Sequence, residues 1–483
     1  MKTFIKPSKI DGRVEAPPSK SMMARAVAAA GLAPGRSLIL NPSFCDDARA
    51  ALGIVQTLGA EVHLESESAS HFPLPTVASL PASLSRAGHE SRAAAKGECP
   101  LGSPNSRLPA ASRGIDPPAV ILRNRLPDDA RDSAVLAITG GNLHGGGDLF
   151  CGESGFCLRL FTPIAAMNAA GRSLHGRESL AARPVGPVED PLRSLGAECL
   201  TRKGFPPVRV RGPLRGGDCR VDAALSSQFL SGLLFALPLA EKPSIVRVSA
   251  LNSKPYVEMT RRVLKDFGVV IEADGNREFF IDAPQNFRPR EFQIEGDWSG
   301  AAFLLVAGAV AGRVRISGLD LESSQADRHI LDALEDCGAR IGHAGGDVVV
   351  ERTAMRAFHF DAVDCPDLFP PLAALACYCE GTTRIRGVHR LRAKESDRAA
   401  ALAGEFSAAG ADVGLEGDML VIRGRPPAGG AARARGDHRI AMALAVAGLG
   451  GGSGIAVDGA ECVSKSYPEF FRDLSRIGAN IHE

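Results

Sequence analysis

The sequence predicts an α/β protein made of six similar units, arranged as two halves of three. Three observations lead to this prediction: a short pattern that recurs along the chain, a nearly constant spacing between its copies, and an ordinary composition. Hydrophobic residues make up 45% of the 483 residues and charged residues 23%, which is typical of folded domains. A chain of this length is expected to form two or more domains.

The recurring pattern is a run with helical apolar spacing, then a glycine, then a run with strand character. Glycine suits the residue that follows a helix, because the backbone often turns left-handed there. Val263, Leu264 and Phe267 have the helical spacing in one copy, and β-branched residues follow. The six glycines are Gly59, Gly196, Gly268, Gly338, Gly410 and Gly478.

The last five copies are separated by 72, 70, 72 and 68 residues, which indicates repeated supersecondary units. The first interval is 137 residues, so the first unit contains an insertion. Residues 66–118 fit this insertion, because these 53 positions include 8 Pro, 10 Ser and 9 Ala, and Phe72 as the one aromatic residue. Such a stretch buries too little apolar surface to offset its ordering entropy, so we expect a flexible insertion. A docking segment for a partner is the alternative.

The charge balance limits the partners of the chain. Its 56 basic and 55 acidic residues give a net charge of +1, so no global field favours nucleic acid or an anionic membrane. Any bound anion therefore needs a local cluster of cations. We expect small-molecule substrates, no nucleic-acid or membrane partner, and a monomer.

The start of the chain and its cysteines indicate the compartment. Residues 1–7 contain no apolar core of a signal peptide, and no run of 18 apolar residues occurs. The 11 cysteines are irregularly spaced, and the Cys377-x-Cys379 pair is a weak metal signal. We expect reduced thiols in a complete, single-function, cytoplasmic protein.

Cations recur at predicted helix starts. Lys20 precedes a helix predicted over Met22–Leu32, and a cation at this end opposes the helix dipole by about 0.3–1 kcal/mol. Arg25 lies four residues after Ser21 on the same helical face. This arrangement is a poor choice for stability and a good one for an anion site. A solvated basic helix start is the alternative.

Three further helix starts in the first half carry polar groups. Gly152–Gly155 leads into a helix from Phe156 that carries Arg159, and Ser226-Ser227-Gln228 precedes a helix over Phe229–Leu239. Ser253 and Lys254 precede a helix over Glu258–Phe267. One serine is enough for a cap, so two serines and a glutamine favour phosphate binding.

The second half has a higher density of charge. Arg392–Arg398 is predicted to begin a helix through Phe406, with Lys394, Glu395 and Arg398 on one face. A salt-bridged surface helix is the alternative. Asp437-His438-Arg439 precedes a helix over Ile440–Leu449, and Lys465-Ser466-Tyr467-Pro468 precedes Phe470. Together these starts predict a cleft for a ligand with several anionic groups.

These segments resemble the EPSP synthase family over nearly the whole chain outside the insertion. Seven motifs in the family's order carry the resemblance: PPSKSMMAR (17–25), ALSSQFLSGLL (224–234), NSKPYVEMT (252–260), EGDWSGAAFLL (295–305), RAKESDR (392–398), GDHRIAMA (436–443) and KSYPEFF (465–471). The resemblance implies a two-domain inside-out α/β barrel with six βαβαββ units, three per domain. It implies a shikimate 3-phosphate domain over 19–295 and a phosphoenolpyruvate domain over 1–18 and 296–483, with a hinge near Pro17–Lys20 and Glu295–Asp297.

The implied activity is transfer of the enolpyruvyl group of phosphoenolpyruvate to the 5-hydroxyl of shikimate 3-phosphate, in chorismate and aromatic amino-acid biosynthesis. The family needs no metal or organic cofactor. Asp367 is the implied base at the hydroxyl, and Glu395, with Lys20 as an alternative donor, the implied acid and base at C3 of phosphoenolpyruvate.

The resemblance also assigns the binding residues. Shikimate 3-phosphate is expected to contact Lys20, Ser21, Arg25, Ser226, Ser227, Ser253, Asp367 and Lys394. Phosphoenolpyruvate is expected to contact Lys20, Gly155, Arg183, Gln228, Arg398, Arg439 and Lys465. One departure is Phe156, a bulky residue beside the expected phosphoenolpyruvate site where the family has a small one.

Two other functions stay open at this point. A related transferase family acts on UDP-N-acetylglucosamine and commonly uses a loop cysteine, but Leu158–Glu198 contains no cysteine. An inactive homologue that serves as a binding module is the second. The joint presence of five residues argues against it: Lys20, Asp367, Glu395, Arg398 and Lys465.

Overall fold

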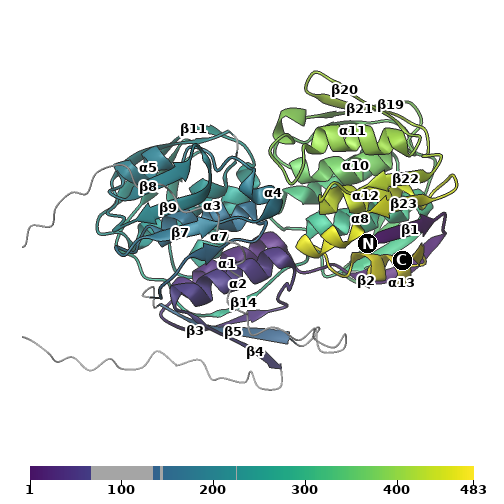
Figure 1. Cartoon of the computed structure of the whole chain (residues 1–483). Coiled ribbons are helices and arrows are strands. Elements are labelled where there is room, and N and C mark those ends of the chain that lie inside the picture. The colour runs from purple at the N-terminus through teal and green to yellow at the C-terminus, as the bar shows by residue number, and fades with distance from the viewer. Residues whose placement is uncertain (67–133, 142–144, 225) are drawn as a thin grey trace, which may run out of the picture.

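The structure is a computed structural model that describes residues 1–66, 134–141, 145–224 and 226–483. Apart from Ser66, the predicted insertion over 66–118 lies outside the described residues. Two lobes lie side by side, each with helices inside and strands outside (Figure 1). Within the described ranges, no helix is both long and apolar enough to cross a membrane.

The described residues form six four-stranded sheets, and all six have the same internal arrangement. Counted by position across each sheet, from the edge that holds the parallel pair, the first and second strands are parallel. The third strand pairs antiparallel with both the second and the fourth. Both lobes therefore use one supersecondary unit three times, and the predicted α/β class is confirmed.

Three of these sheets belong to the lobe that contains most of the first half of the chain, which we call the N-lobe. They are β14 (Glu291–Gln293), β3 (Gly35–Leu40), β5 (Ala134–Gly140) and β4 (Glu61–Ser66); β6 (Leu149–Phe150), β7 (Arg172–His175), β9 (Phe205–Arg211) and β8 (Glu198–Arg202); and β10 (Asp218–Ala223), β11 (Ser244–Leu251), β13 (Glu278–Ile281) and β12 (Glu272–Asp274).

The other three sheets belong to the second lobe, the C-lobe. They are β2 (Ile10–Glu15), β15 (Gly312–Ser317), β17 (Asp347–Glu351) and β16 (Arg340–Ala344); β18 (His359–Asp361), β19 (Thr382–Arg386), β21 (Met419–Arg423) and β20 (Asp412–Glu416); and β22 (Gly430–Arg433), β23 (Ile455–Asp458), β1 (Lys2–Lys6) and β24 (Asn480–His482). The N-terminal strands β1 and β2 thus complete sheets of the C-lobe.

Helices connect the strands and fill the inside of each lobe. In the N-lobe these are α1 (Lys20–Leu32), α2 (Asp46–Leu58), α3 (Gly155–Ala165), α4 (Glu178–Ala181), α5 (Glu189–Ser194), α6 (Gln228–Ala236) and α7 (Lys254–Asp266). In the C-lobe they are α8 (Trp298–Ala311), α9 (Ile330–Asp336), α10 (Phe369–Ala376), α11 (Arg398–Ala408), α12 (His438–Ala447) and α13 (Phe470–Arg476).

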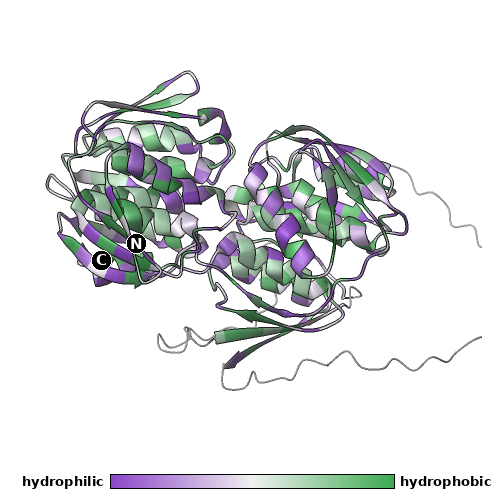
Figure 2. Cartoon of the chain, turned by 180° about the vertical axis from the view of Figure 1, so that it is seen from behind, coloured by the Kyte–Doolittle hydropathy of each residue, from purple (hydrophilic) through white to green (hydrophobic). Residues whose placement is uncertain are grey.

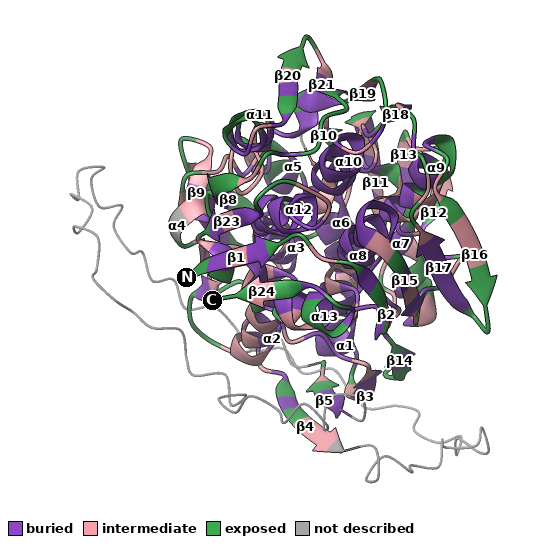
Figure 3. Ribbon diagram, turned by 90° about the vertical axis from the view of Figure 1, so that its right-hand side faces the viewer, coloured by how far each residue is buried: buried purple, intermediate pink, exposed green. Residues whose placement is uncertain are grey.

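Helix composition explains why the helices lie inside. Every residue of α8, α10 and α12 is buried, and these helices are almost entirely apolar apart from Ser299 in α8 and His438 and Arg439 at the start of α12. A helix of this kind is stable only when other elements surround it. Hydrophobic helices fill both lobes in Figure 2, and Figure 3 shows the buried helices behind a layer of partly exposed strands.

Two separate hydrophobic cores result. One core lies in the N-lobe and takes its residues from Met22 to Ile294. The other lies in the C-lobe and combines residues between Ile5 and Ala16 with residues from Trp298 to Ala479.

The six repeat glycines confirm the left-handed turn that the sequence predicts after each helix. Their φ angles are 116° at Gly59, 91° at Gly196, 84° at Gly268, 87° at Gly338, 87° at Gly410 and 114° at Gly478. A side chain at any of these positions would strain the backbone.

The chain crosses between the lobes twice, and the two crossovers bond to each other. The amide of Ser19 donates to the carbonyl of Glu295 at 2.9 Å, and the amide of Asp297 donates to the carbonyl of Pro17 at 2.6 Å. Lys20, the first residue of α1, and Trp298, the first of α8, directly follow these crossovers. The start of α1 is therefore held at the junction of the lobes.

Candidate active site

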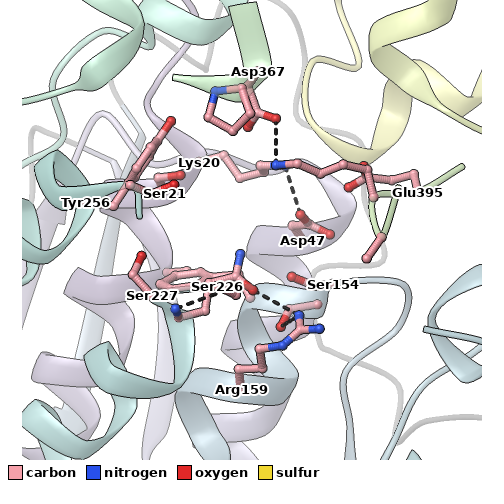
Figure 4. Close-up of a pocket in the computed structure, with 18 of the residues that line it drawn as sticks. Lys20, Ser21, Asp47, Ser154, Arg159, Ser226, Ser227, Tyr256, Asp367 and Glu395 are labelled. Carbon is pink, nitrogen blue, oxygen red and sulfur yellow. Dashed lines mark hydrogen bonds and ion pairs between the residues drawn. The ribbon is translucent and has the colours of Figure 1, made fainter. Parts of the chain in front are cut away.

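A cavity of about 130 Å³ lies between the lobes and is lined by residues of both. Its N-lobe wall consists mainly of the starts of α1, α3, α6 and α7, and its C-lobe wall of the segments around Asp367, Glu395 and Arg439. Figure 4 shows Asp367 and Glu395 on one side of the cavity, with Ser226, Ser227 and Arg159 on the other.

Lys20 enters this cavity from the first turn of α1. Ser19 caps the helix by accepting a hydrogen bond from the amide of Met22, and Lys20 pairs with Asp47 at 3.0 Å. Burial lowers the pKa of Lys20, but the pairing with Asp47 outweighs burial and leaves that pKa raised. The ammonium is therefore charged, and a carboxylate holds it in position.

Arg25 lies one turn further along α1 and is only 2% exposed. Its guanidinium donates to the carbonyls of Ser21 at 2.8 Å and Tyr256 at 3.0 Å, and to the hydroxyl of Thr260 at 2.9 Å. It also lies over the ring of Phe156, 4.4 Å from the centroid. Burial lowers the pKa of Arg25 to about 9, because these neutral acceptors do not replace the lost water. An anionic ligand would relieve that cost.

The start of α3 shapes the neighbouring wall. Ser154 caps the helix through the amide of Cys157, and Gly155 lines the cavity. A side chain at Gly155 would lie 2.8 Å from a guanidinium nitrogen of Arg159 and 3.1 Å from one of Arg183. Glycine at this position therefore lets two arginines approach one another.

Arg159 fixes the position of its neighbours. Its guanidinium donates to the carbonyls of Pro184 at 2.6 Å and Val185 at 2.9 Å, and to the side-chain oxygen of Gln228 at 3.0 Å. Burial, with help from Arg183, lowers the pKa of Arg159 to about 9. Arg159 thus orients two predicted ligand-binding residues, Arg183 and Gln228.

Arg183 has unused donors. Its Nε and Nη1 are buried without hydrogen-bond partners, and the nearest carboxylate is that of Glu395 at 3.8 Å. Buried donors of this kind are rare unless a ligand completes them. Arg183 is therefore a strong candidate for an anion contact.

Hydroxyl groups gather at the starts of α6 and α7. Ser226 accepts a hydrogen bond from the amide of Gln228 at 3.2 Å, while Ser227, the N-cap of α6, makes no side-chain cap. Ser253, the N-cap of α7, also makes no side-chain cap and has a left-handed backbone with φ of 59°. Capping therefore explains only one of the three serines.

The C-lobe wall is a network of paired charges around Asp367. Its carboxylate lies 3.1 Å from Lys394, 2.8 Å from Arg398 and 3.2 Å from Arg439. Burial raises the pKa of Asp367, but these cations, Arg439 first, outweigh burial and hold that pKa well below its usual range. Asp367 is therefore a carboxylate that can accept a proton when a ligand weakens this field.

Glu395 belongs to the same network. It pairs with Arg398 at 2.6 Å, and Arg398 also pairs with Asp437 at 2.9 Å. Burial raises the pKa of Glu395, but Arg398 and Arg183 outweigh burial and keep that pKa well below its usual range. Glu395 is thus ionised.

The segment over 392–398 corrects one expectation. The helix α11 begins at Arg398 with Asp397 as its cap, so Lys394 and Glu395 lie on a preceding turn and not on a helix face. The predicted proximity of Glu395 and Arg398 is found, but the turn produces it. Asp397 caps through the amide of Ala400, which sets the start of the helix.

Two predicted contacts are not on the cavity wall. Arg398 is 0% exposed and pairs with three carboxylates, and Lys465 pairs with Glu153 at 2.5 Å and donates to the carbonyl of Gly436 at 2.8 Å. The predicted residues that do line the cavity are Lys20, Ser21, Arg25, Gly155, Arg183, Ser226, Ser227, Gln228, Ser253, Asp367, Lys394, Glu395 and Arg439.

Sequence reasoning missed several members of the site. Asp47 and Tyr256 line the cavity but were not predicted to do so. Asp47 lies in the first turn of α2, where an acidic residue usually serves the helix dipole. His438 lies beside the cavity network, fully buried, with neither ring nitrogen bonded. Burial and Lys20 hold the pKa of His438 well below its usual value, so the ring is neutral. Its place between Asp437 and Arg439 was the available signal.

Metal chemistry has no evident centre in the described part of the chain, where no group of three or more His, Cys, Asp or Glu side chains is arranged to hold an ion.

Comparison with known proteins identifies the family. The family model described as EPSP synthase (3-phosphoshikimate 1-carboxyvinyltransferase) matches residues 5–89 and 128–474. The chain belongs to the EPSP synthase family. A 3-phosphoshikimate 1-carboxyvinyltransferase of Aeropyrum pernix is 37% identical, over 99% of this chain and 96% of that protein. The one of Methanocorpusculum labreanum is 34% identical, over all of both chains.

Solved structures agree on the fold. An EPSP synthase from Acinetobacter baumannii superposes with a TM-score of 0.72 at 23% identity, covering 100% of both chains. The enolpyruvyl transferase NikO from Streptomyces tendae gives a TM-score of 0.70 at 18% identity, over 100% of this chain and 98% of that one. The chain thus has the two-domain fold of the EPSP synthase family and its relatives.

Proposed function

We propose that the protein transfers the enolpyruvyl group of phosphoenolpyruvate to the 5-hydroxyl of shikimate 3-phosphate, in the synthesis of chorismate and aromatic amino acids. The observation that carries this proposal is the cavity between the lobes, where uncompensated buried cations face a pair of ionised carboxylates. Two substrates with two phosphates and two carboxylates need such a set of cations to offset desolvation and mutual repulsion.

Shikimate 3-phosphate is proposed to bind the N-lobe wall. Its phosphate is held by the hydroxyls of Ser226, Ser227 and Ser253, with Lys394 nearby. Its carboxylate lies near Ser21 and Arg25, with Lys20 within reach. The reacting hydroxyl then faces Asp367 across the cavity.

Phosphoenolpyruvate is proposed to bind between Lys20, Arg183, Gln228 and Arg439, close to the backbone of Gly155. The unbonded donors of Arg183 support this assignment. Arg398 and Lys465 are paired with carboxylates of the protein, so direct contact with the ligand requires them to exchange partners.

The proposed reaction is an addition followed by an elimination. The oxygen of the substrate hydroxyl bonds to C2 of phosphoenolpyruvate while Asp367 takes the proton of that hydroxyl, and a donor protonates C3. The tetrahedral intermediate then loses a proton from C3 and phosphate from C2, which restores the double bond. Glu395 is the proposed acid and base at C3, with Lys20 as the alternative donor.

The charge state of Glu395 fits this role only when substrate is present. Arg398 and Arg183 hold the pKa of Glu395 well below its usual range and keep the carboxylate ionised. Anionic phosphoenolpyruvate beside Arg183 offsets that field, so binding raises the pKa of Glu395 and lets it carry a proton.

The lobes are proposed to move about a hinge at Pro17–Lys20 and Glu295–Asp297, between a domain over 19–295 and one over 1–18 and 296–483. The paired crossovers and the two separate cores support this division. We also propose a cytoplasmic monomer without nucleic-acid or membrane partners. The ten described cysteines are free and buried, as expected in a reducing compartment.

The experiment is release of phosphate from phosphoenolpyruvate by the purified protein, with shikimate 3-phosphate and, in parallel, with UDP-N-acetylglucosamine. Release that depends on shikimate 3-phosphate is expected. Release only with the nucleotide sugar moves the protein to the other transferase class. No release with either acceptor, from a folded sample, favours a binding module.

A further inference from the structure

The first turn of α7, in the N-lobe, is bonded directly to two side chains of the C-lobe. The carboxylate of Asp364, in the C-lobe, accepts hydrogen bonds from the amides of Ser253 at 2.8 Å and Lys254 at 3.4 Å. Arg390, also in the C-lobe, donates to the hydroxyl of Ser253 at 2.8 Å. Residues from opposite sides of the cleft therefore meet at one serine.

This contact replaces a missing local cap. A serine that precedes a helix usually caps it with its own hydroxyl. Ser253 does not, because its left-handed backbone, with φ of 59° and ψ of 44°, turns the side chain away from the helix. The amide of Lys254 needs another acceptor, and Pro255 has no amide hydrogen to offer. Asp364 supplies the acceptor from the other lobe.

The consequence is a hydroxyl at the cavity that does not cap its own helix. Ser253 lines the cavity and is 8% exposed, so its side chain is directed toward the ligand space and not toward its own helix. Arg390 bridges this hydroxyl to the carbonyl of Ala224, at 2.7 Å, just before Ser226 and Ser227. The two serine groups of the proposed phosphate site are thereby held at a fixed separation.

The same segment reaches the reacting centre. Asp364 is followed by the buried residues Cys365 and Pro366 and then by Asp367. A four-residue stretch therefore connects the cap on α7 to the carboxylate that is proposed to face the substrate hydroxyl. Cys365 packs in the C-lobe core and Pro366 is buried, which restrains the distance between the two carboxylates.

We propose that Asp364 is a positioning residue for the shikimate 3-phosphate site: it caps α7 across the cleft, so the Ser253 hydroxyl is not needed as a cap and can donate to phosphate. This inference rests on the proposed function. It implies that the phosphate site is complete only when the lobes are together, although its three serines all belong to the N-lobe.

The test compares Asp364→Ala, Asp364→Asn and the control Glu258→Ala by initial rates of phosphate release. Glu258 is an exposed acidic residue of α7 that pairs with Arg261 and does not line the cavity. Loss of the cap is expected to raise the KM for shikimate 3-phosphate about 10-fold in Asp364→Ala, with kcat and the KM for phosphoenolpyruvate within about 3-fold. Asp364→Asn is expected to be near wild type, because an amide oxygen also caps. Glu258→Ala is expected to match wild type.

An unchanged KM for shikimate 3-phosphate in a folded, active Asp364→Ala variant overturns the inference. So does an Asp364→Asn variant as defective as the alanine, since that result assigns the effect to charge and not to capping. Wild-type protein without turnover contradicts the proposed function instead. Calorimetric binding of shikimate 3-phosphate to wild type and Asp364→Ala then decides the capping role: weaker binding by the variant supports it, and equal or absent binding in both opposes it.

Discussion

The two walls of the cavity differ in whether their buried charges are paired. On the N-lobe wall, Arg25 and Arg159 form no ion pair with any described residue, and burial lowers the pKa of each to about 9. On the C-lobe wall, Asp367 and Glu395 are surrounded by cations that keep their pKa values well below the usual range. Uncompensated cations gain most from an anionic ligand, whereas paired carboxylates keep a defined charge until a ligand changes their field.

This difference assigns binding mainly to the N-lobe wall and proton transfer mainly to the C-lobe wall. The assignment is contradicted if a substitution on the N-lobe wall changes mainly kcat, or if a substitution of one of the two carboxylates on the C-lobe wall changes mainly KM.

Replacement of the central carboxylate should have the largest effect. Asp367→Asn keeps the shape of the side chain but cannot take the proton of the hydroxyl, so kcat should fall by about 10³-fold. Steady-state phosphate release measures it, with Asp361→Asn, an exposed residue paired with Arg386, as the control. If kcat falls by less than about 10-fold in a folded variant, Asp367 is not the base that takes the proton of the hydroxyl.

Glu395→Gln should lower kcat by about 10²-fold, since Lys20 remains as a second donor near C3. The pH dependence of kcat sharpens the comparison, because the variant should lose the ionisation that belongs to residue 395. A normal kcat with a normal pH profile would assign the C3 proton to another group.

Ser227→Ala should raise the KM for shikimate 3-phosphate about 10-fold and leave kcat within about 3-fold, because one charge-assisted hydrogen bond to phosphate is lost. Ser227 makes no cap in the unliganded structure, so the fold should tolerate the change. If kcat falls while KM is constant, the N-lobe wall takes part in the chemistry and the comparison fails.

Asp297, at the crossover between the lobes, gives a smaller test of whether burial disfavours a charged side chain in this protein. Burial raises the pKa of Asp297, the cap of α8, from 3.8 to about 6. An acid with a raised pKa in the folded state stabilises the fold fully below pH 3.8 and loses that contribution as the pH rises through 6. Relative to wild type, Asp297→Asn should therefore become more stable by about 2–3 kcal/mol between pH 4 and pH 7.

Denaturant unfolding at several pH values measures this difference. Asparagine keeps an oxygen for the amide of Ser299, which Asp297 caps at 3.3 Å, so the cap itself is a constant in the comparison. A stability difference that is flat with pH would mean that Asp297 is not destabilised as an anion.

The sequence predicted much of the fold because the repeat pattern is local. The glycine after each helix, the apolar helices before it and the alternating strands after it follow from the chain itself. The use of β1 and β2 in sheets of the C-lobe could not be read from local pattern, since their partners are hundreds of residues away. The resemblance to the family supplied the assignment of residues 1–18 to that side.

Site residues could be predicted where the residue types mark a helix start or a family motif. They were missed where only a contact with another element brings a residue to the site. Lys20 was named from a helix start, and Arg183 and Asp367 from the resemblance to the family; all three line the cavity. Asp47 and Asp364 were not, because nothing in their neighbours indicates a partner on another element. Glu395 was placed on a helix face, but a turn that ends at the Asp397 cap holds it near Arg398.

The division of labour between the two walls is tested most directly by calorimetric titration of Asp367→Asn with shikimate 3-phosphate. Binding within about 3-fold of wild type is expected in a variant whose turnover is lost, because most of the proposed phosphate and carboxylate contacts belong to the N-lobe wall. Loss of binding in parallel with turnover, from a protein with a normal melting temperature, would contradict it.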